Sequence, residues 1–320
     1  MKGGSKSAHR GQPAAHRTVA DLEQGLVVAG HGRHFVVETP EGREIIVHPR
    51  GKKSDAVVGD RLRFQITDSR GDEGVIVSLD PRRNLLHRQD EWRTKSFAAN
   101  LDRLLILVAA DPVFSESQLT RALVAAEQAR IEVLILLNKT DLTAAAQVAR
   151  ERLEPYRRMG YTVMELALKA RPDEARAELG ERLAHGSTLV LGPSGTGKST
   201  LVNLLVPDAG AQIGEVSVAL NSGRHTTTHT RWYWLDRARE SALIDSPGFQ
   251  EFGLHHVSVD DLSHWMADLR PWRGHCRFAN CTHDHEPGCA VLAALERGEI
   301  TPSRYRIYLE LRAELSATRW

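Results

Sequence analysis

The segment Gly192 to Ser199 constrains the fold more than any other part of this sequence. It reads Gly-Pro-Ser-Gly-Thr-Gly-Lys-Ser, the pattern of a phosphate-binding loop. Such a loop follows a strand and opens a helix, and residues 187–191 and 198–205 predict these two elements. Glycines let backbone N–H groups turn toward phosphate oxygens, Lys198 reaches the β and γ phosphates, and Ser199 offers a hydroxyl to Mg²⁺. The predicted phosphate-binding residues are Gly192, Pro193, Ser194, Gly195, Thr196, Gly197, Lys198, Ser199 and Thr200.

An alternation of strands and helices surrounds this loop. Predicted helices at 117–129, 144–158, 173–184 and 198–205 alternate with predicted strands at 104–109, 131–137, 161–166, 187–191 and 242–244. This order predicts an α/β domain over residues 101–256, with a doubly wound parallel sheet and helices on both faces. The apolar runs 104–110 and 133–137 are too short to span a bilayer, so we expect no membrane segment.

The first hundred residues have a different character. Residues 18–86 predict a small β-barrel, with short strands at 25–29, 35–39, 44–48, 61–67 and 74–79. The OB-fold is the usual five-stranded barrel, and another small β-domain is the alternative. Residues 87–100 are polar and charged, as expected for a linker. Residues 1–17 contain no acidic residue and predict a basic disordered tail, which is either a solvated terminus or a nucleic-acid contact.

A second motif selects the base. Asn138, Lys139, Thr140 and Asp141 follow the predicted strand 131–137. An aspartate there accepts hydrogen bonds from the ring N–H and exocyclic amine of guanine, a donor pair that adenine does not present. Lys139 can lie over the base, and Asn138 can tie this loop to the phosphate loop. Alone, this tetrapeptide is also an ordinary surface turn, but its place in the same sheet as a phosphate-binding loop favours a guanine site.

Two further elements complete the predicted nucleotide site. Asp245 ends the strand 242–244, where its carboxylate can hold Mg²⁺ through water, and the N–H of Gly248 can meet the γ-phosphate. Thr226 and Thr227, with Thr228 beside them, offer hydroxyl ligands for Mg²⁺ on a glycine-hinged loop. The sequence does not distinguish which threonine binds the metal.

The C-terminal segment, residues 257–320, predicts helices around a metal site. All three cysteines of the chain, Cys276, Cys281 and Cys289, lie within fourteen residues. An odd number of clustered cysteines favours a metal over disulfides, and three thiolates with one histidine would close a structural Zn²⁺ site. His275, His283 and His285 compete for the fourth position, and three buried thiols are the alternative. A later helix interleaves basic and aromatic residues, and it either contacts RNA or packs against the protein: Arg304, Tyr305, Arg306 and Tyr308.

The order of these motifs resembles one known family. The guanine motif precedes the phosphate loop, as in the circularly permuted GTPases, and the chain is most similar to the ribosome small subunit-dependent GTPase A family. The specific marks are Asn100-Leu101-Asp102, the run Gly-Arg-His-Thr-Thr-Thr at 223–228, and the Cys-Arg-Phe-x-x-Cys-x-His segment. Two departures are present: Leu166–Lys169 lacks the usual Ser-Ala motif beside the guanine, and Ser246 replaces a common threonine.

The resemblance implies roles for two histidines. It favours His283 as the fourth zinc ligand, and it places His225 on the first switch near the γ-phosphate. Phe249 follows Gly248 where many GTPases carry the glutamine that orients water, and a phenyl ring cannot do so. Gln250 lies one position late. His225 is therefore the leading catalytic candidate, with slow intrinsic hydrolysis expected.

The resemblance also supplies the expected partner. It implies a GTP hydrolase that binds the small ribosomal subunit and its rRNA as a late assembly factor, with GTP, Mg²⁺ and one structural Zn²⁺ per chain. We expect a monomer, and a cytoplasmic protein because the N-terminus lacks the apolar stretch of a secretory signal. The net charge of +1 argues neither for nor against nucleic acid. The alternatives are a P-loop ATPase or small-molecule kinase, and an RNA-binding module with a non-hydrolysing G domain.

Overall fold

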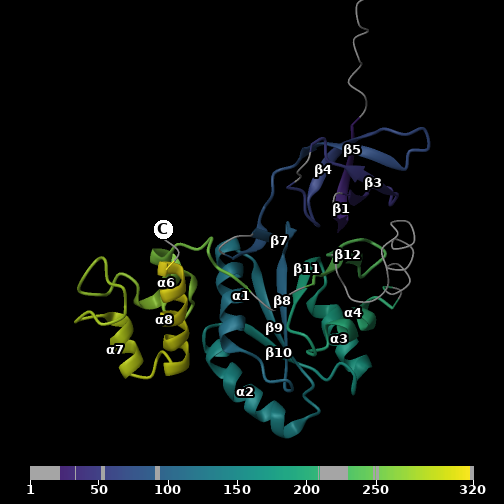
Figure 1. Ribbon diagram of the computed structural model, residues 1–320. Coiled ribbons are helices and arrows are strands. Elements are labelled where there is room, and N and C mark those ends of the chain that lie inside the picture. The colour runs from purple at the N-terminus through teal and green to yellow at the C-terminus, as the bar shows by residue number, and fades with distance from the viewer. Residues whose placement is uncertain are drawn as a thin grey trace, which may run out of the picture.

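Three structural parts are arranged around one long sheet. The computed structural model describes residues 22–32, 34–51, 55–90, 94–207, 209, 230–247, 249 and 252–317. Within these residues, the sheet has the strand order β10-β9-β8-β11-β13-β12-β1-β2-β3-β5-β4, and β6 pairs separately with β7. In Figure 1 the barrel lies at the upper right, the α/β domain in the centre and the C-terminal helices at the left.

The N-terminal part is the predicted five-stranded barrel. Its strands are β1 (Glu23–His31), β2 (His34–Glu38), β3 (Glu44–His48), β4 (Arg61–Ile66) and β5 (Glu73–Leu79). Pairing of β1 with both β2 and β4 closes the ring. Because side chains alternate along a strand, every second residue points inward, and Val37, Val47 and Phe64 are among those buried in the core.

The predicted linker at 87–100 is wrong, because this segment is largely folded. Strands β6 (Leu85–Gln89) and β7 (Thr94–Ala99) pair antiparallel. Leu86 and Phe97 are buried, whereas their polar neighbours gave the segment its linker-like composition. Phe97 stacks on Phe252 at a ring-centroid distance of 5.6 Å, so the hairpin is fastened to the α/β domain.

The central part is the predicted parallel sheet. Strands β8 (Arg103–Ala109), β9 (Glu132–Asn138), β10 (Thr162–Glu165), β11 (Gly186–Leu191) and β13 (Ser241–Asp245) run parallel. Their near-continuous burial is what a sheet covered on both faces requires.

One further strand, β12 (Arg231–Trp234), was not predicted from the sequence. It is antiparallel to β13, and Arg231 pairs with Ala29 of β1, which continues the sheet into the barrel. Trp232 and Trp234 pack against an outer apolar patch of the barrel. The indole of Trp234 also donates to Glu38 at 2.9 Å. The barrel is thus attached to the α/β domain by both backbone pairing and side chains.

Helices cover both faces of the sheet. Helices α1 (Glu116–Ala129) and α2 (Thr143–Arg158) cover one face of the sheet. They share a core with the strand residues that point to this face, such as Ile106. Helices α3 (Pro172–Arg182) and α4 (Lys198–Leu205) share a second core with the opposite positions, such as Leu107. The doubly wound arrangement predicted from the sequence is therefore confirmed.

The C-terminal part is helical, as predicted. It contains η1 (Val259–Asp261), α6 (Leu262–Trp265), η2 (Arg270–Trp272), α7 (Ala290–Glu296) and α8 (Pro302–Ala317). Figure 1 shows α6 and α8 beside α1. Arg121 of α1 pairs with Glu314 of α8, and Arg270 donates to Glu127 of α1 at 2.5 Å. These ion pairs join the module to the α/β domain.

Of the two predicted roles for the basic and aromatic helix, the structure supports packing. Arg304 is buried, donates to Asp268 at 2.7 Å and 3.0 Å, and also donates to the hydroxyl of Thr120 on α1. Its guanidinium lies 5.3 Å from the ring centroid of Tyr156 on α2. Tyr308 is also buried. Neither Arg304 nor Tyr308 is available to an RNA.

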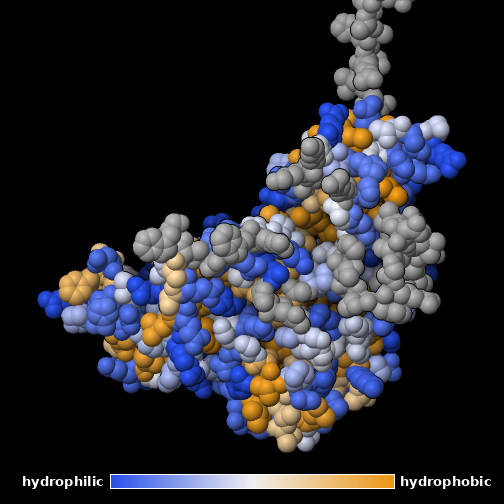
Figure 2. Space-filling model, viewed as in Figure 1, coloured by the Kyte–Doolittle hydropathy of each residue, from blue (hydrophilic) through white to orange (hydrophobic). Residues whose placement is uncertain are grey.

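The visible surface is mostly hydrophilic. Figure 2 shows apolar residues in small groups between polar ones on this face. None of the helices in the described part of the chain is long and apolar enough to cross a membrane.

Candidate nucleotide site and metal centre

The predicted nucleotide-binding segments meet at one edge of the sheet. Strands β8, β9, β11 and β13 are parallel, so the loops that follow them lie at the same edge. Ligands of open α/β sheets bind in the crevice outside these carboxyl ends. The structure therefore brings together three sets of residues far apart in sequence: 138–141, 192–200 and Asp245.

The phosphate-binding loop has the backbone that its glycines allow. Gly195 and Gly197 have φ values of 80° and 106°, a region that residues with a side chain rarely adopt. At Gly192 a Cβ atom would lie 2.4 Å from the carbonyl oxygen of Leu107, so only glycine fits where the loop leaves β11. Within the loop, the buried Thr196 hydroxyl donates to the carbonyl of Pro193 at 2.9 Å.

Lys198 lies at the start of α4, with its ammonium inside the loop. It donates to the carbonyls of Gly192 at 2.5 Å and Pro193 at 3.1 Å. Burial lowers the pKa of Lys198, and the nearby carboxylate of Asp245 opposes that shift. Ser199 and Thr200 follow in the exposed first turn of α4. An ammonium held here is placed to meet phosphate oxygens cradled by the loop.

Asn138 fastens the base-reading loop to the phosphate loop. Its side-chain amide donates to the carbonyl of Thr196 at 2.8 Å, and its oxygen accepts from the backbone N–H of Leu168 at 3.0 Å. Leu168 belongs to the segment that lacks the Ser-Ala motif, and its backbone is nevertheless held in the site. One buried side chain thus fixes three loops relative to one another.

Lys139 and Asp141 flank the position expected for the base. Lys139 adopts a φ of 63° and donates to the carbonyl of Asp111 at 2.6 Å. Asp141 is exposed, whereas Thr140 is buried with its N–H directed to the carbonyl of Leu166 at 3.3 Å. The loop therefore presents one carboxylate outward on a backbone anchored on both sides.

A substitution at Gly197 tests whether Asn138 holds the base-reading loop and the phosphate loop together. A Cβ atom at this position would lie 2.4 Å from the amide nitrogen of Asn138. We expect Gly197→Ala to displace Asn138 and to lower GTP affinity by at least about tenfold, or roughly 1.4 kcal/mol, in a nucleotide titration. Gly180→Ala in α3 is the matched control, because a Cβ there would meet nothing within 4 Å. Unchanged GTP affinity in Gly197→Ala would contradict the bridging role of Asn138.

Only some of the residues predicted to contact Mg²⁺ and the γ-phosphate lie within the described part of the chain. Asp245 is buried at the end of β13, beside Val190 of β11. The hydroxyls of Ser246 and Thr230 lie 3.0 Å apart. His225, Thr226, Thr227 and Gly248 lie outside the described residues, so their predicted roles stay predictions. Phe249 is buried and lies 6.1 Å from the ring of Phe252, which agrees with its expected inability to orient water.

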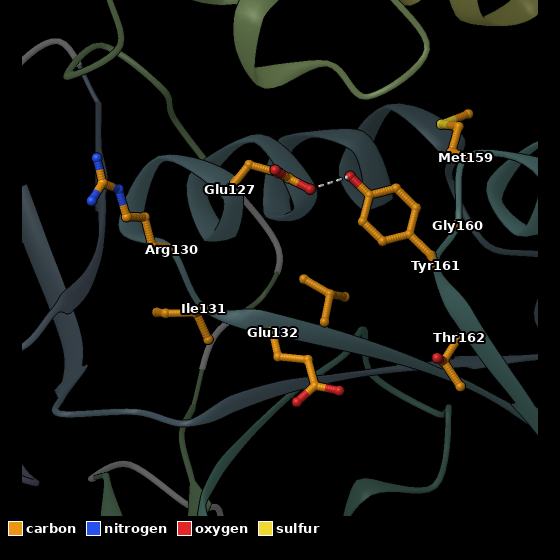
Figure 3. A pocket seen from close by; sticks show the side chains of 9 residues that line it. Glu127, Arg130, Ile131, Glu132, Met159, Gly160, Tyr161 and Thr162 are labelled. Carbon is orange, nitrogen blue, oxygen red and sulfur yellow. Dashed lines mark hydrogen bonds between the residues drawn. The ribbon is translucent and has the colours of Figure 1, made fainter. Parts of the chain in front are cut away.

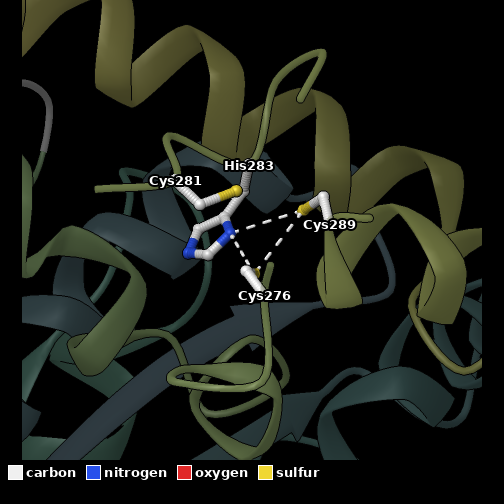
Figure 4. Close-up of side chains that lie close together, drawn as sticks. All are labelled: Cys276, Cys281, His283 and Cys289. Carbon is white, nitrogen blue, oxygen red and sulfur yellow. Dashed lines mark hydrogen bonds between the residues drawn. The ribbon is translucent and has the colours of Figure 1, made fainter. Parts of the chain in front are cut away.

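The predicted metal ligands form one group. Among the described residues, Cys276, Cys281, His283 and Cys289 place their ligand atoms within 4.8 Å of one another (Figure 4). Nδ1 of His283 lies 3.4 Å from Sγ of Cys276 and 3.5 Å from Sγ of Cys289, and these two sulfurs are 3.9 Å apart. Tetrahedral zinc bonds predict separations of about 3.6 Å for sulfur to nitrogen and about 3.8 Å for sulfur to sulfur. The donor set and the spacing both fit a closed zinc site.

Burial shifts the pKa values of the predicted metal ligands. Burial and the neighbouring cysteines raise the pKa of the Cys281 thiol to about 12, although the backbone N–H of His283 opposes the shift. Burial likewise raises the pKa of Cys289 and lowers that of His283. Several thiolates therefore do not coexist here unless a metal ion stabilises their charge.

Sequence reasoning missed the residues that support this loop. Glu286 accepts from the N–H of Thr282 at 2.6 Å and from its hydroxyl at 2.5 Å. Desolvation would raise the pKa of Glu286, but these hydrogen bonds outweigh it and hold the pKa well below its usual range. Tyr305 donates to the carbonyl of His283 at 2.9 Å, and Tyr308 donates to that of Thr282 at 2.8 Å. The only sequence signal was that Glu286 lies between the ligands His283 and Cys289.

A separate pocket lies at the far end of β9. It has a volume of about 420 Å³ and is bordered by the end of α1 and the starts of β9 and β10 (Figure 3). Tyr161 donates to Glu127 at 3.0 Å across it. Glu132 and Asn138 mark opposite ends of β9, about 20 Å apart at the usual rise per residue, so this pocket is not part of the nucleotide site.

A family model and similar proteins from other organisms match most of this chain, and they carry the same family name. Residues 79–255 match the family model described as RsgA GTPase. The small ribosomal subunit biogenesis GTPase RsgA of Variovorax paradoxus (strain S110) is 58% identical over 303 residues, which are 93% of this chain and 94% of that protein. The protein of the same name from Burkholderia pseudomallei (strain K96243) is 55% identical over 306 residues, 95% of this chain and 96% of that protein.

Two solved structures have a similar fold. YjeQ from Thermotoga maritima aligns with a TM-score of 0.71 and 29% identity, covering 92% of this chain and 98% of that one. YloQ, described as a circularly permuted GTPase, aligns with a TM-score of 0.69 and 24% identity, covering 96% and 99%.

Proposed function

Because this chain belongs to the RsgA GTPase family, we propose that it hydrolyses GTP to GDP and phosphate as an assembly factor of the small ribosomal subunit. The observation that carries the GTPase part is Asn138, which ties the base-reading loop to the phosphate loop through the carbonyl of Thr196 at 2.8 Å. The partner is supported by the names of relatives that are 55–58% identical over more than nine tenths of the chain.

Binding is divided among the three loops. Asp141 pairs with the guanine ring N–H and amine, and Lys139 covers the base. Backbone N–H groups of the phosphate loop and the Lys198 ammonium would hold the phosphates. Ser199 and, through water, Asp245 would hold Mg²⁺, which would neutralise phosphate charge. Thr226 or Thr227 would offer a further hydroxyl to Mg²⁺, and the N–H of Gly248 would meet the γ-phosphate.

Hydrolysis then requires a group that orients water. Phe249 is turned into the core, so it cannot take the place of a catalytic glutamine. We assign this role to His225, because an imidazole is well suited to general acid–base chemistry. Because Phe249 stands where many GTPases carry a water-orienting glutamine, we expect the free protein to hydrolyse GTP slowly.

The barrel and the C-terminal module are the contact surfaces for the subunit and its rRNA. They flank the α/β domain on two sides in Figure 1, so one partner can restrain the domain from both. We further propose that the chain acts as a cytoplasmic monomer at a late stage of assembly, with one structural Zn²⁺ in the module.

The decisive experiment is GTP hydrolysis with and without purified small subunits. We expect stimulation of at least about tenfold, equivalent to roughly 1.4 kcal/mol of barrier, because docking restrains the switch before reaction. His225→Ala should lose most of that gain and keep GTP affinity, since the imidazole acts in the transition state. Large subunits serve as the control and should not stimulate. Equal stimulation by both subunits, or by neither, would refute the assigned partner.

A further inference from the structure

Two histidines face each other on the outer surface of the barrel. The β2–β3 register pairs Phe35 with Val47, and both of these residues are buried in the barrel core. The preceding residue on β2 and the following residue on β3, His34 and His48, therefore lie opposite one another and point outward. His31 of β1 pairs with His34 in the β1–β2 register, so a third imidazole borders the pair.

The two imidazoles converge through the same ring atom. Their Nδ1 atoms are 2.9 Å apart, and the rings meet edge to face at 85° with centroids 4.6 Å apart. When two nitrogens bind the same ion, each at about 2.0–2.1 Å, their separation depends on the angle between the two bonds. It is about 2.9 Å at a right angle and about 3.4 Å at a tetrahedral angle. The same separation fits an N–H···N hydrogen bond, which an ion replaces once each ring carries its proton on Nε2.

A carboxylate that can favour this tautomer lies near Nε2 of His48. Oε2 of Glu73 on β5 lies 4.0 Å from Nε2 of His48, and the Glu73 side chain is 59% exposed and free to close the gap. Metal-bound histidines commonly donate their second ring N–H to a carboxylate, which fixes the tautomer and orients the ring. A proton held on Nε2 of His48 by Glu73 would leave the Nδ1 lone pair of His48 directed at His34.

We propose that His34 and His48 form a second metal site, for a divalent transition ion that prefers imidazole, such as Ni²⁺, Cu²⁺ or Zn²⁺. Glu73 is the positioning residue for His48. The site is separate from the cysteine cluster and takes no part in the proposed GTP chemistry. A bound ion cross-links β2 to β3 and stabilises the barrel by mass action.

Nickel titration of the tag-free, zinc-loaded full chain tests this site. Calorimetry should detect one Ni²⁺ bound per chain without release of zinc. His34→Gln and His48→Gln should each weaken that binding at least about tenfold, and Glu73→Gln should weaken it severalfold. Nickel should raise the thermal midpoint of the wild-type protein and leave that of the His34→Gln protein unchanged.

His185→Asn is the matched control. His185 is an exposed imidazole 3.1 Å from Glu240, and its substitution should leave nickel binding unchanged. Equal nickel affinity in wild type and His34→Gln would overturn the proposal. So would nickel uptake matched by zinc release, because the cysteine cluster would then be the nickel site.

Discussion

Asp141→Asn protein should bind GTP at least about a hundredfold more weakly than wild type, a loss of roughly 2.8 kcal/mol. The carboxylate accepts two hydrogen bonds from guanine. An asparagine side chain accepts only through its oxygen, and its NH₂ group would face one of the N–H donors of guanine. Sites that hydrogen-bond a polar substrate group discriminate strongly, because a mismatch leaves buried groups unpaired. The same variant should gain affinity for xanthosine triphosphate, whose ring carbonyl accepts from the new amide.

Fluorescent-nucleotide competition measures both changes. Asp173→Asn is the matched control: the Asp173 side chain is 96% exposed on α3 and belongs to neither the base-reading loop nor the phosphate loop, so GTP affinity should stay at the wild-type value. Unchanged GTP affinity in Asp141→Asn would remove the guanine assignment. Equal competition by ATP and GTP in the wild type would instead favour the ATPase alternative.

Loss of zinc should have the largest effect on stability. Metal analysis of native protein should find about one zinc per chain, and Cys281→Ser should abolish it. Structural zinc contributes on the order of 10–16 kcal/mol to small zinc folds, so the module should unfold without it. GTP affinity should largely persist, since the base and phosphate loops contain none of the ligands.

Two controls sharpen the zinc experiment. His285→Ala alters an imidazole in the same loop whose side chain is 81% exposed, and it should keep the metal. His283→Ala should lose it, because His283 is buried within the ligand group. Stoichiometric zinc in Cys281→Ser, or no zinc in the wild type, would refute the metal assignment.

Local sequence was sufficient to predict the backbone of the phosphate loop, because its motif acts through backbone geometry. Glycines at 195 and 197 supply positive φ values that their neighbours in the loop do not need. Parallel strand order then brings Asn138 next to this loop, as the motif required. The alternating strands and helices of the α/β domain were also predicted from local sequence. Apolar residues follow one spacing in a buried strand and another in a helix that packs on a sheet.

Elements stabilised by distant partners could not be predicted this way. Besides its pairing with β6, strand β7 is fastened by the stacking of Phe97 on Phe252. Besides its pairing with β13, strand β12 pairs with the distant β1. The role of Arg304 was equally hidden, because its neighbours Asp268 and Thr120 lie 36 and 184 residues away. The choice among three histidines as zinc ligand depended on resemblance until the structure brought His283 to the cysteines.

The contacts of Arg304 limit how such proteins exchange parts. Its guanidinium contacts a hydroxyl from α1 and an aromatic ring from α2, so this buried residue of the C-terminal module is fitted to the surface of the α/β domain. A module transplanted from a relative with other residues at 120 and 156 would forfeit these contacts, at about 1.5–3 kcal/mol for the charged hydrogen bond alone. We therefore expect a transplanted module to be more stable when Thr120 and Tyr156 are transferred with it.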